Sequence, residues 1–184
     1  MIQTMRRSLL LIAFVAFAAA SAQAQDCDCT ASIEGPKAGQ HSGALAGSGG
    51  IDVVLWPPNH KLHEVAISAV DSDGEPCDVE IVSVSQDEAV DAPGSGNTIG
   101  ADAENCSNDG DTSTVDLRAE RSGLGNGRFY DIEYTMEDNE MMPGTCTDQH
   151  AIALVPHDQR RDQSGWADDG LQLTSGVVCT PGMM

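Results

Sequence analysis

Apolar and polar residues alternate along much of the chain between residues 51 and 155, which is the pattern of half-buried β-strands. The longest alternating stretch, 115–136, has two arms separated by a turn with Gly123, Gly125, Asn126 and Gly127. Glycine and asparagine supply the positive φ angles of tight turns. This stretch therefore predicts a β-hairpin.

Other segments read as strands that end at turn residues: 51–56, 62–70, 77–85 and 150–155. Proline stops the first at Pro57 and the last at Pro156, because it gives no ladder donor. A long acidic loop is expected from about 86 to 112, with a short strand near 98–99, and 171–174 could add another strand. Six or seven short strands with almost no helical periodicity indicate an all-β, antiparallel sandwich of about seven strands.

The first residues read as an export signal. Arg6 and Arg7 precede an apolar run over 9–20 that is too short to span a bilayer, and Ala22-Gln23-Ala24 suits cleavage. We therefore expect a secreted or periplasmic product. The expected organisation is a signal peptide at 1–24, a flexible Gly-rich arm at 25–50, the sandwich at 51–158 and an irregular tail at 159–184.

The chain carries 29 acidic and nine basic residues, for a net charge of −20. Such a field repels nucleic acid and anionic lipid, so neither is expected as a partner, and no later segment is apolar enough to span a membrane. The acid excess is typical of solubility outside the cell, and divalent-cation binding is the alternative explanation.

Six cysteines follow the signal, an even number that favours structural disulfides in an exported chain. Their spacing matches neither the C-x-x-C of redox enzymes nor that of zinc sites. The pairing stays open, because six cysteines allow fifteen connectivities. The candidates are Cys27, Cys29, Cys77, Cys106, Cys146 and Cys179.

Three short segments carry a resemblance: LWPPNHK at 55–61, LRAERSG with GNGR at 117–123 and 125–128, and VPHD at 155–158. Together they resemble a bacterial extracellular immunoglobulin-like module that often occurs as repeats in large secreted proteins. The resemblance implies an immunoglobulin-like sandwich used for adhesion, spacing or accessory binding. This chain carries one copy, and 141–146 departs from the simpler turn expected there.

In an immunoglobulin-like sandwich the first strand commonly runs parallel to the last. This would bring Asn59, His60, His157 and Asp158 to one end of the molecule, as a hydrogen-bonded clasp or, alternatively, a metal or ligand site. We favour the clasp, since two histidines without a clear third ligand are a thin case for zinc. Trp56 is expected as a core plug.

Two acidic turns are the candidate calcium loops, and calcium is the one cofactor that the sequence offers. Carboxylates, amides and glycine in a short turn can supply the oxygens that a hard cation needs, although ordinary acidic turns have the same composition. Arg118, Glu120 and Arg121 are expected in cross-strand pairs on a wet face. The candidate calcium ligands are Asp71, Asp73, Asn105, Asn108, Asp109 and Asp111.

No catalytic motif is present: there is no G-x-S-x-G elbow, phosphate loop or dinucleotide fingerprint, and His63-Glu64 lacks the second histidine of a zinc protease. We therefore expect a secreted, non-catalytic module that acts through binding, adhesion or surface interaction with a protein or glycan. The alternatives are an accessory carbohydrate-binding module and a calcium-dependent adhesive module.

Overall fold

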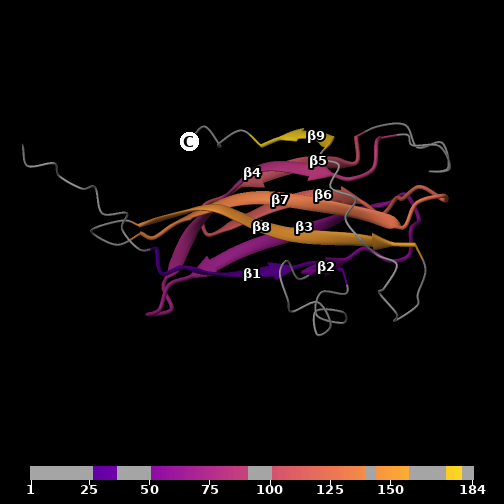
Figure 1. Cartoon of the computed structure of the whole chain (residues 1–184). Helices are drawn as coiled ribbons and strands as arrows, with labels where there is room; N and C mark the ends of the chain where they lie inside the picture. Colours follow the sequence, from indigo (N-terminus) through magenta and orange to yellow (C-terminus); the bar gives the residue numbers. More distant parts are fainter. Residues whose placement is uncertain (1–26, 37–50, 91–100, 140–143, 158–172, 180–184) are drawn as a thin grey trace, which may run out of the picture.

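The computed structural model describes residues 27–36, 51–90, 101–139, 144–157 and 173–179 (Figure 1). Nine strands lie within these ranges, and no helix among them is long and apolar enough to cross a membrane. The strands are β1 (Thr30–Glu34), β2 (Val53–Val54), β3 (Leu62–Val70), β4 (Pro76–Gln86), β5 (Ala103–Asn108), β6 (Thr112–Arg118), β7 (Gly127–Glu137), β8 (Thr145–Pro156) and β9 (Leu173–Val178).

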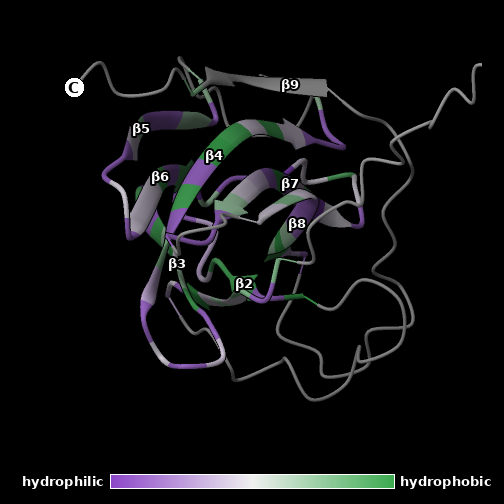
Figure 2. Cartoon of the chain, turned by 90° about the vertical axis from the view of Figure 1, so that its left-hand side faces the viewer, coloured by the Kyte–Doolittle hydropathy of each residue, from purple (hydrophilic) through white to green (hydrophobic). Residues whose placement is uncertain are grey.

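The strand pairings fall into two ladders that β4 joins. One ladder has the order β1-β3-β6-β5, and the other has the order β2-β8-β7-β4-β9. The first residues of β4 also pair with the end of β3, which connects the ladders into one open sheet. Figure 2 shows β3, β5 and β6 on one side and β4, β7 and β8 on the other.

All pairings among the described strands are antiparallel except that of β2 with β8. In this parallel pair Val53 lies opposite Ala153 and Val54 opposite Leu154. The all-β class expected from the sequence is therefore confirmed, and so is the expectation that the first strand of the 51–158 region runs beside the last.

The main core takes its side chains from both ladders. Strand alternation points one face of each strand into this core. The side chains of Val65 and Ile67 (β3), Leu117 (β6), Ile81 (β4) and Ile132 (β7) are fully buried there. A second, smaller cluster contains Ile51, Val54 and Leu154, with Trp56 and Phe129 packed partly buried against it. Trp56 thus packs at the start of the turn that follows β2.

The predicted hairpin at 115–136 is wrong. Both arms are strands with the expected inward faces, but β6 pairs with β3 and β5, whereas β7 pairs with β4 and β8. Residues 119–126 therefore cross from one ladder to the other. Period-two alternation fixes which face of a strand is buried, but it does not determine which strand lies beside it.

The structure also extends the fold beyond residues 51–158. Part of the expected flexible arm, Thr30–Glu34, is β1 and pairs with β3, and Leu173–Val178 of the expected tail is β9 and pairs with β4. Within the expected loop of 86–112 lies β5. The signal peptide, the short strand near 98–99 and most of the arm and tail lie outside the described residues.

All six cysteines are paired, as Cys27–Cys146, Cys29–Cys77 and Cys106–Cys179. The first two bridges fasten the residues just before β1 to β8 and β4, and the third joins β5 to the residue after β9. The strands outside 51–158 are therefore covalently attached. Three disulfides are consistent with an extracellular, oxidising environment, as the cysteine count predicts.

The strands run between two ends of the molecule, which we name by their charged residues. The arginine end consists of 55–62, 86–90, 101–103, 118–128 and 155–157, and the acidic end consists of 27–29, 70–76, 108–112, 137–139 and 144–146. Every lysine and arginine among the described residues lies at the arginine end: Lys61, Arg118, Arg121 and Arg128.

Candidate functional site: a buried ionic network and an acidic pocket

The arginine end contains a buried ion pair between Arg128 of β7 and Asp102, which immediately precedes β5. Their side chains are 0% and 1% exposed, and Arg128 Nη1 lies 2.7 Å from Asp102 Oδ2. Gln86 at the end of β4 donates to the same carboxylate oxygen over 2.9 Å. Arg128 is in phase with Tyr130 and Ile132, so strand alternation points it into the end of the core, where a charge needs a partner.

Two more groups complete the surroundings of Arg128. Glu88, after β4, lies 3.5 Å from Arg128 Nε, and the Tyr130 hydroxyl accepts from Arg128 Nη1 and donates to the carbonyl oxygen of Arg118. Burial raises the pKa of Asp102, and the nearby Arg128 offsets only part of this effect. Burial also raises the pKa of Tyr130, so its hydroxyl stays a donor.

Arg118 at the end of β6 ties together segments that are far apart in the sequence. It donates to the Ala101 carbonyl oxygen from two nitrogens, to the Glu104 carboxylate over 2.8 Å and to the His60 carbonyl oxygen over 3.1 Å. The expected cross-strand pairing of Arg118 is therefore found, with Glu104 of β5, whereas the wet-face position expected for Arg118 and Glu120 is wrong. Arg118 has a side chain only 13% exposed, and Glu120 is fully buried.

His60 joins the turn after β2 to the connection between β6 and β7. Its Nδ1 lies 3.2 Å from Glu120 Oε2, and the His60 side chain is 45% exposed, whereas that of Glu120 is 0% exposed. Two backbone hydrogen bonds reinforce the contact, from His60 N to Ala119 O and from Ala119 N to Lys61 O. His60 adopts a φ of 61°, an uncommon angle for a residue with a side chain.

Three residues of the expected clasp, Asn59, His60 and His157, lie at the arginine end, so the clasp stays a prediction. Asn59 accepts from the Lys61 backbone amide, and His157 Nε2 lies 3.4 Å from the Gly123 carbonyl oxygen. His60 and His157 thus both contact the β6–β7 connection, each through a different residue of it. Asp158 lies outside the described residues.

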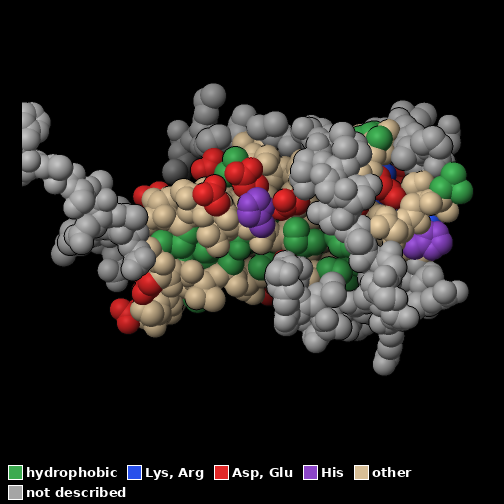
Figure 3. Space-filling model, in the orientation of Figure 1, with side chains coloured by type: hydrophobic (Ala, Val, Ile, Leu, Met, Phe, Trp, Pro, Cys, Tyr) green, Lys and Arg blue, Asp and Glu red, His purple; other side chains and the backbone are tan. Residues whose placement is uncertain are grey.

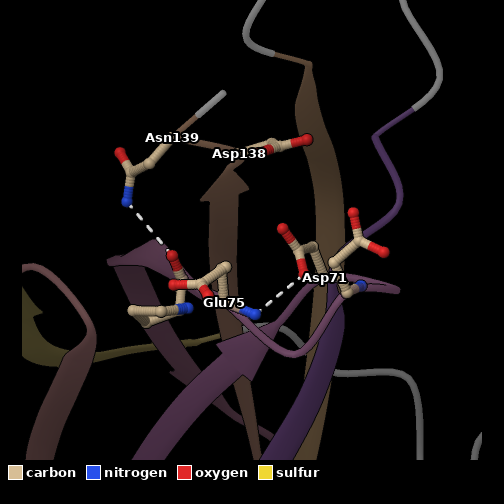
Figure 4. Close-up of a pocket in the computed structure, with 6 residues that line it drawn as sticks. Asp71, Glu75, Asp138 and Asn139 are labelled. Carbon is tan, nitrogen blue, oxygen red and sulfur yellow. Dashed lines mark hydrogen bonds between the residues drawn. The ribbon is translucent and has the colours of Figure 1, made fainter. Parts of the chain in front are cut away.

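The acidic end contains an open pocket of about 270 Å³ between the β3–β4 turn and the residues after β7. Two of the candidate calcium ligands, Asp71 and Asp73, line it together with Glu75, Pro76, Asp138 and Asn139 (Figure 4). Asp71 Oδ1 accepts from the backbone amides of Asp73 and Glu75, which holds the turn. Asn139 donates to the Pro76 carbonyl oxygen and the Asp78 carboxylate.

The other candidate calcium ligands lie apart from this pocket, on β5 and its following turn. Asn108 bridges to the Ile81 backbone, Asn105 donates to Asp116, and Asp109 accepts from Ser107. Asp111 is exposed in the same turn. Within the ranges that the structure describes, no three His, Cys, Asp or Glu side chains are grouped closely enough to hold a metal ion.

A third polar region lies across the outward face of β4, β7 and β8. His150 Nδ1 lies 2.8 Å from Asp131 Oδ1, with the two side chains 49% and 26% exposed. Ser83 donates to Glu133 over 2.8 Å on the neighbouring positions. In Figure 3 acidic side chains gather around a histidine on this face, whereas the visible lysine and arginine atoms lie at the opposite end from the left-hand acidic cluster.

The sequence reasoning missed the buried network as a unit. Its members come from the ends of four segments, 86–88, 101–104, 118–120 and 128–130, and the alternation of Tyr130 and Ile132 was the signal that could have placed Arg128 inside. The three segments that carry the family resemblance all contribute to this end. Comparisons with known proteins found no matching family model, no matching curated protein and no matching solved structure.

Proposed function

We propose that the chain is a secreted, non-catalytic immunoglobulin-like module that acts through binding, adhesion or surface interaction. The observation that carries this proposal is the joining of the three resembling segments at the arginine end. His60 contacts Glu120, Arg118 contacts the turn that holds His60, and His157 contacts Gly123. Their charged groups thus serve to hold the module together.

The arrangement of the strands supports an immunoglobulin-like sandwich. Two ladders contribute to one core, and the parallel pairing of β2 with β8 lies at an edge, as that module type implies. The disulfides attach the outermost strands β1 and β9 to this framework. A rigid, cross-linked scaffold is suited to presenting loops outside the cell.

The loops of the acidic end are the binding surface in this proposal. At the arginine end Arg118 and Arg128 pair with carboxylates of the same end, whereas the pocket of the acidic end is open and lined by exposed or partly buried acids. A partner with a positively charged or cationic group fits this chemistry. Calcium-dependent adhesion is the second candidate function: Asp71 and Asp73 line the same pocket as Asp138, and because these carboxylates are not grouped as a metal site in the structure, calcium would have to draw them together.

Thermal unfolding of the mature protein tests these functions. Calcium, a chelator, a panel of polysaccharides and basic peptides are added in turn, because a ligand that binds only the folded state raises the Tm. We expect a rise with at least one binding partner and none with the chelator. The absence of a rise with millimolar calcium removes the calcium function, and release of sugar from any polysaccharide contradicts a non-catalytic module.

A matched pair of variants locates the site. Asp73→Asn removes an exposed carboxylate from the pocket, and Glu64→Gln removes one from β3 outside it. If the acidic end binds the partner, the ligand-induced rise in Tm shrinks in Asp73→Asn and is retained in Glu64→Gln. Equal rises in both variants would place binding elsewhere on the module.

A further inference from the structure

The two ends of the molecule present opposite charges to solvent. The described residues of the arginine end include four lysine or arginine side chains and four carboxylates. Of these carboxylates, Asp87, Asp102 and Glu120 are buried. The side chain of Glu88 is only 10% exposed, whereas Lys61 is exposed. The acidic end has eight carboxylates and, within the described residues, no lysine or arginine: Asp28, Asp71, Asp73, Glu75, Asp109, Asp111, Glu137 and Asp138.

Lys61 is the cation of the arginine end that is most accessible to a partner. Arg118 and Arg128 pair with carboxylates inside this end, and Arg121 is partly buried. The backbone carbonyl oxygen of Lys61 accepts from the Ala119 amide, which fixes where the lysine side chain begins. Its ammonium group forms no ion pair with any residue that the structure describes, and is therefore available to an acidic surface.

Exposed large apolar side chains lie at the same two ends. Among the described residues there are three: Val70 is 47% exposed at the acidic end, and Val90 and Leu124 are 37% and 88% exposed at the arginine end. Val70 is the last residue of β3, directly before the turn that lines the acidic pocket. Leu124 lies in the β6–β7 connection, where its amide donates to Ser122 Oγ and the Ser122 amide donates to Glu88. A contact between opposite ends would cover apolar surface on both sides.

The pocket of the acidic end suits a single lysine side chain. Its volume of about 270 Å³ is below the range of about 300–1,000 Å³ that is typical of small-molecule sites. The β3–β4 turn contributes Asp71, Asp73 and Glu75 to its lining, and Asp138 follows β7 (Figure 4). A lysine carries a compact ammonium group on a flexible four-carbon stem, so its charge can reach into the pocket while its backbone stays outside.

We propose that copies of this protein associate head to tail, with Lys61 of one copy in the acidic pocket of the next and Leu124 near Val70. This inference rests on the proposed role of the acidic end as the binding surface, and it names a second copy as the cationic partner. Like ends are poor partners, because two acidic ends repel each other and the carboxylates described at the arginine end are buried or nearly so.

The position of the two surfaces determines the form of the assembly. They differ from each other and lie at opposite ends of the strands, so the contact is heterologous and continues into a line of copies. The molecules share a negative net charge, but at physiological ionic strength charges more than about 8 Å apart are largely screened. The charges at the contact therefore decide whether it forms.

Sedimentation velocity of the mature protein, up to millimolar concentration and at several salt concentrations, tests the association. We expect the mean mass to rise with protein concentration, and this rise to disappear in about 1 M salt, where the screening length is about 3 Å. Lys61→Gln should raise the dissociation constant by about fivefold or more, whereas Lys61→Arg and the control Glu64→Gln, on β3 outside both ends, should not. A monomer under all conditions, or equal weakening in Lys61→Gln and Glu64→Gln, overturns the proposal.

Mixing two variants tests the head-to-tail arrangement itself. Lys61→Gln retains the acidic pocket, and Asp73→Lys retains Lys61, so each variant lacks one half of the contact. Each should remain largely monomeric alone and unfold at the wild-type Tm, because both positions are exposed. Their mixture should form dimers and no larger species, since one intact contact joins the two variants. No dimer in the mixture, or dimers of either variant alone, would contradict a contact between opposite ends.

The same proteins separate failure of this inference from failure of the proposed function. If the wild type stays monomeric while basic peptides still raise its Tm, and Asp73→Asn reduces that rise, the acidic end binds a cationic partner other than a second copy. If the wild type stays monomeric and basic peptides leave its Tm unchanged, the acidic end is not the binding surface for a cationic partner. Both outcomes exclude the head-to-tail contact, but only the second also removes its basis.

Discussion

The strand ends are held together by different interactions at the two ends of the molecule. The arginine end closes with buried charged side chains that meet a partner inside the protein: Arg128 pairs with Asp102, and Glu120 contacts the half-exposed His60. The acidic end leaves its carboxylates in solvent and is closed by the bridges Cys27–Cys146 and Cys29–Cys77. Charged side chains that pair inside the protein stabilise the fold. Carboxylates that remain exposed to solvent are available to a ligand.

The largest loss of stability is expected when the guanidinium of Arg128 is removed from the arginine end. Arg128→Met removes the closer ion-pair partner of the buried Asp102 and leaves only Arg118 Nε, 4.0 Å away; breaking one side of such a buried pair typically costs about 3–5 kcal/mol in the free energy of unfolding. Denaturant unfolding measures the loss. The same experiment on Glu75→Gln, an exposed acid of the acidic end, should give a change within about 0.5 kcal/mol.

A double variant shows whether the loss of stability in Arg128→Met comes from the charge of Asp102 that is left buried. Arg128→Met combined with Asp102→Leu replaces both charged groups by apolar ones, and such replacements are often close to neutral. Most of the stability lost in Arg128→Met should return in the double variant. If it does not, the hydrogen bonds of Arg128 to Tyr130 and Ala89 matter more than the charge of Asp102.

Removal of a disulfide at the acidic end should lower the free energy of unfolding by less than removal of Arg128 at the arginine end. Replacing Cys29 and Cys77 by alanine releases the attachment of β1 to β4, and a bridge that closes a loop of 48 residues is worth about 2–4 kcal/mol. Thermal unfolding should show a lower Tm, and hydrogen exchange should rise first in β1 and the start of β4. Loss of protection at 118–128 instead would mean that the two ends are not stabilised independently.

Two glycines with positive φ compare the packing of the two ends. A Cβ on Gly127, where φ is 122°, would lie 3.0 Å from the Val155 carbonyl oxygen, whereas a Cβ on Gly74, where φ is 86°, would meet no atom within 4 Å. Both alanine variants carry backbone strain of about 1–3 kcal/mol, and only Gly127→Ala adds a steric clash. We expect Gly127→Ala to have the lower denaturation midpoint, and equal midpoints would contradict the tighter packing of the arginine end.

Much of the fold follows from local pattern, and each failure has a physical cause. Alternation correctly placed Leu117 and Tyr130 inside, and an even cysteine count in an exported chain predicted disulfides. The hairpin at 115–136 failed because strand partners are selected by contacts distant in the sequence. Thr30–Glu34 escaped notice because its alternation, with Ala31 and Ile33 facing the core, lasts only five residues and precedes a glycine-rich stretch.

For the candidate sites too, the sequence predicts local features but not the contacts between distant segments. The turn residues Asp71 and Asp73 were recognisable from composition, but Asp138 joins their pocket from a segment more than sixty residues away. Glu120 was expected on a wet face because charged residues are usually exposed, and only the approach of His60 in three dimensions explains why it is buried. Sequence reasoning names the residue types, and the tertiary contacts decide which of them meet.

The smallest expected effect concerns the sign of a pH dependence at the arginine end. Burial raises the pKa of Asp102, so the folded protein binds this proton more tightly than the unfolded chain does. By linkage, the stability associated with Asp102 is present below its unfolded pKa and decreases as pH rises through the folded pKa.

Asp102→Asn imitates the protonated side chain at every pH. The unfolding free energy of the variant, measured relative to wild type from pH 3 to pH 7 in denaturant, should therefore shift in the variant's favour as pH increases. A shift in favour of the wild type would mean that pairing with Arg128 outweighs burial, and that the charge of Asp102 stabilises the arginine end.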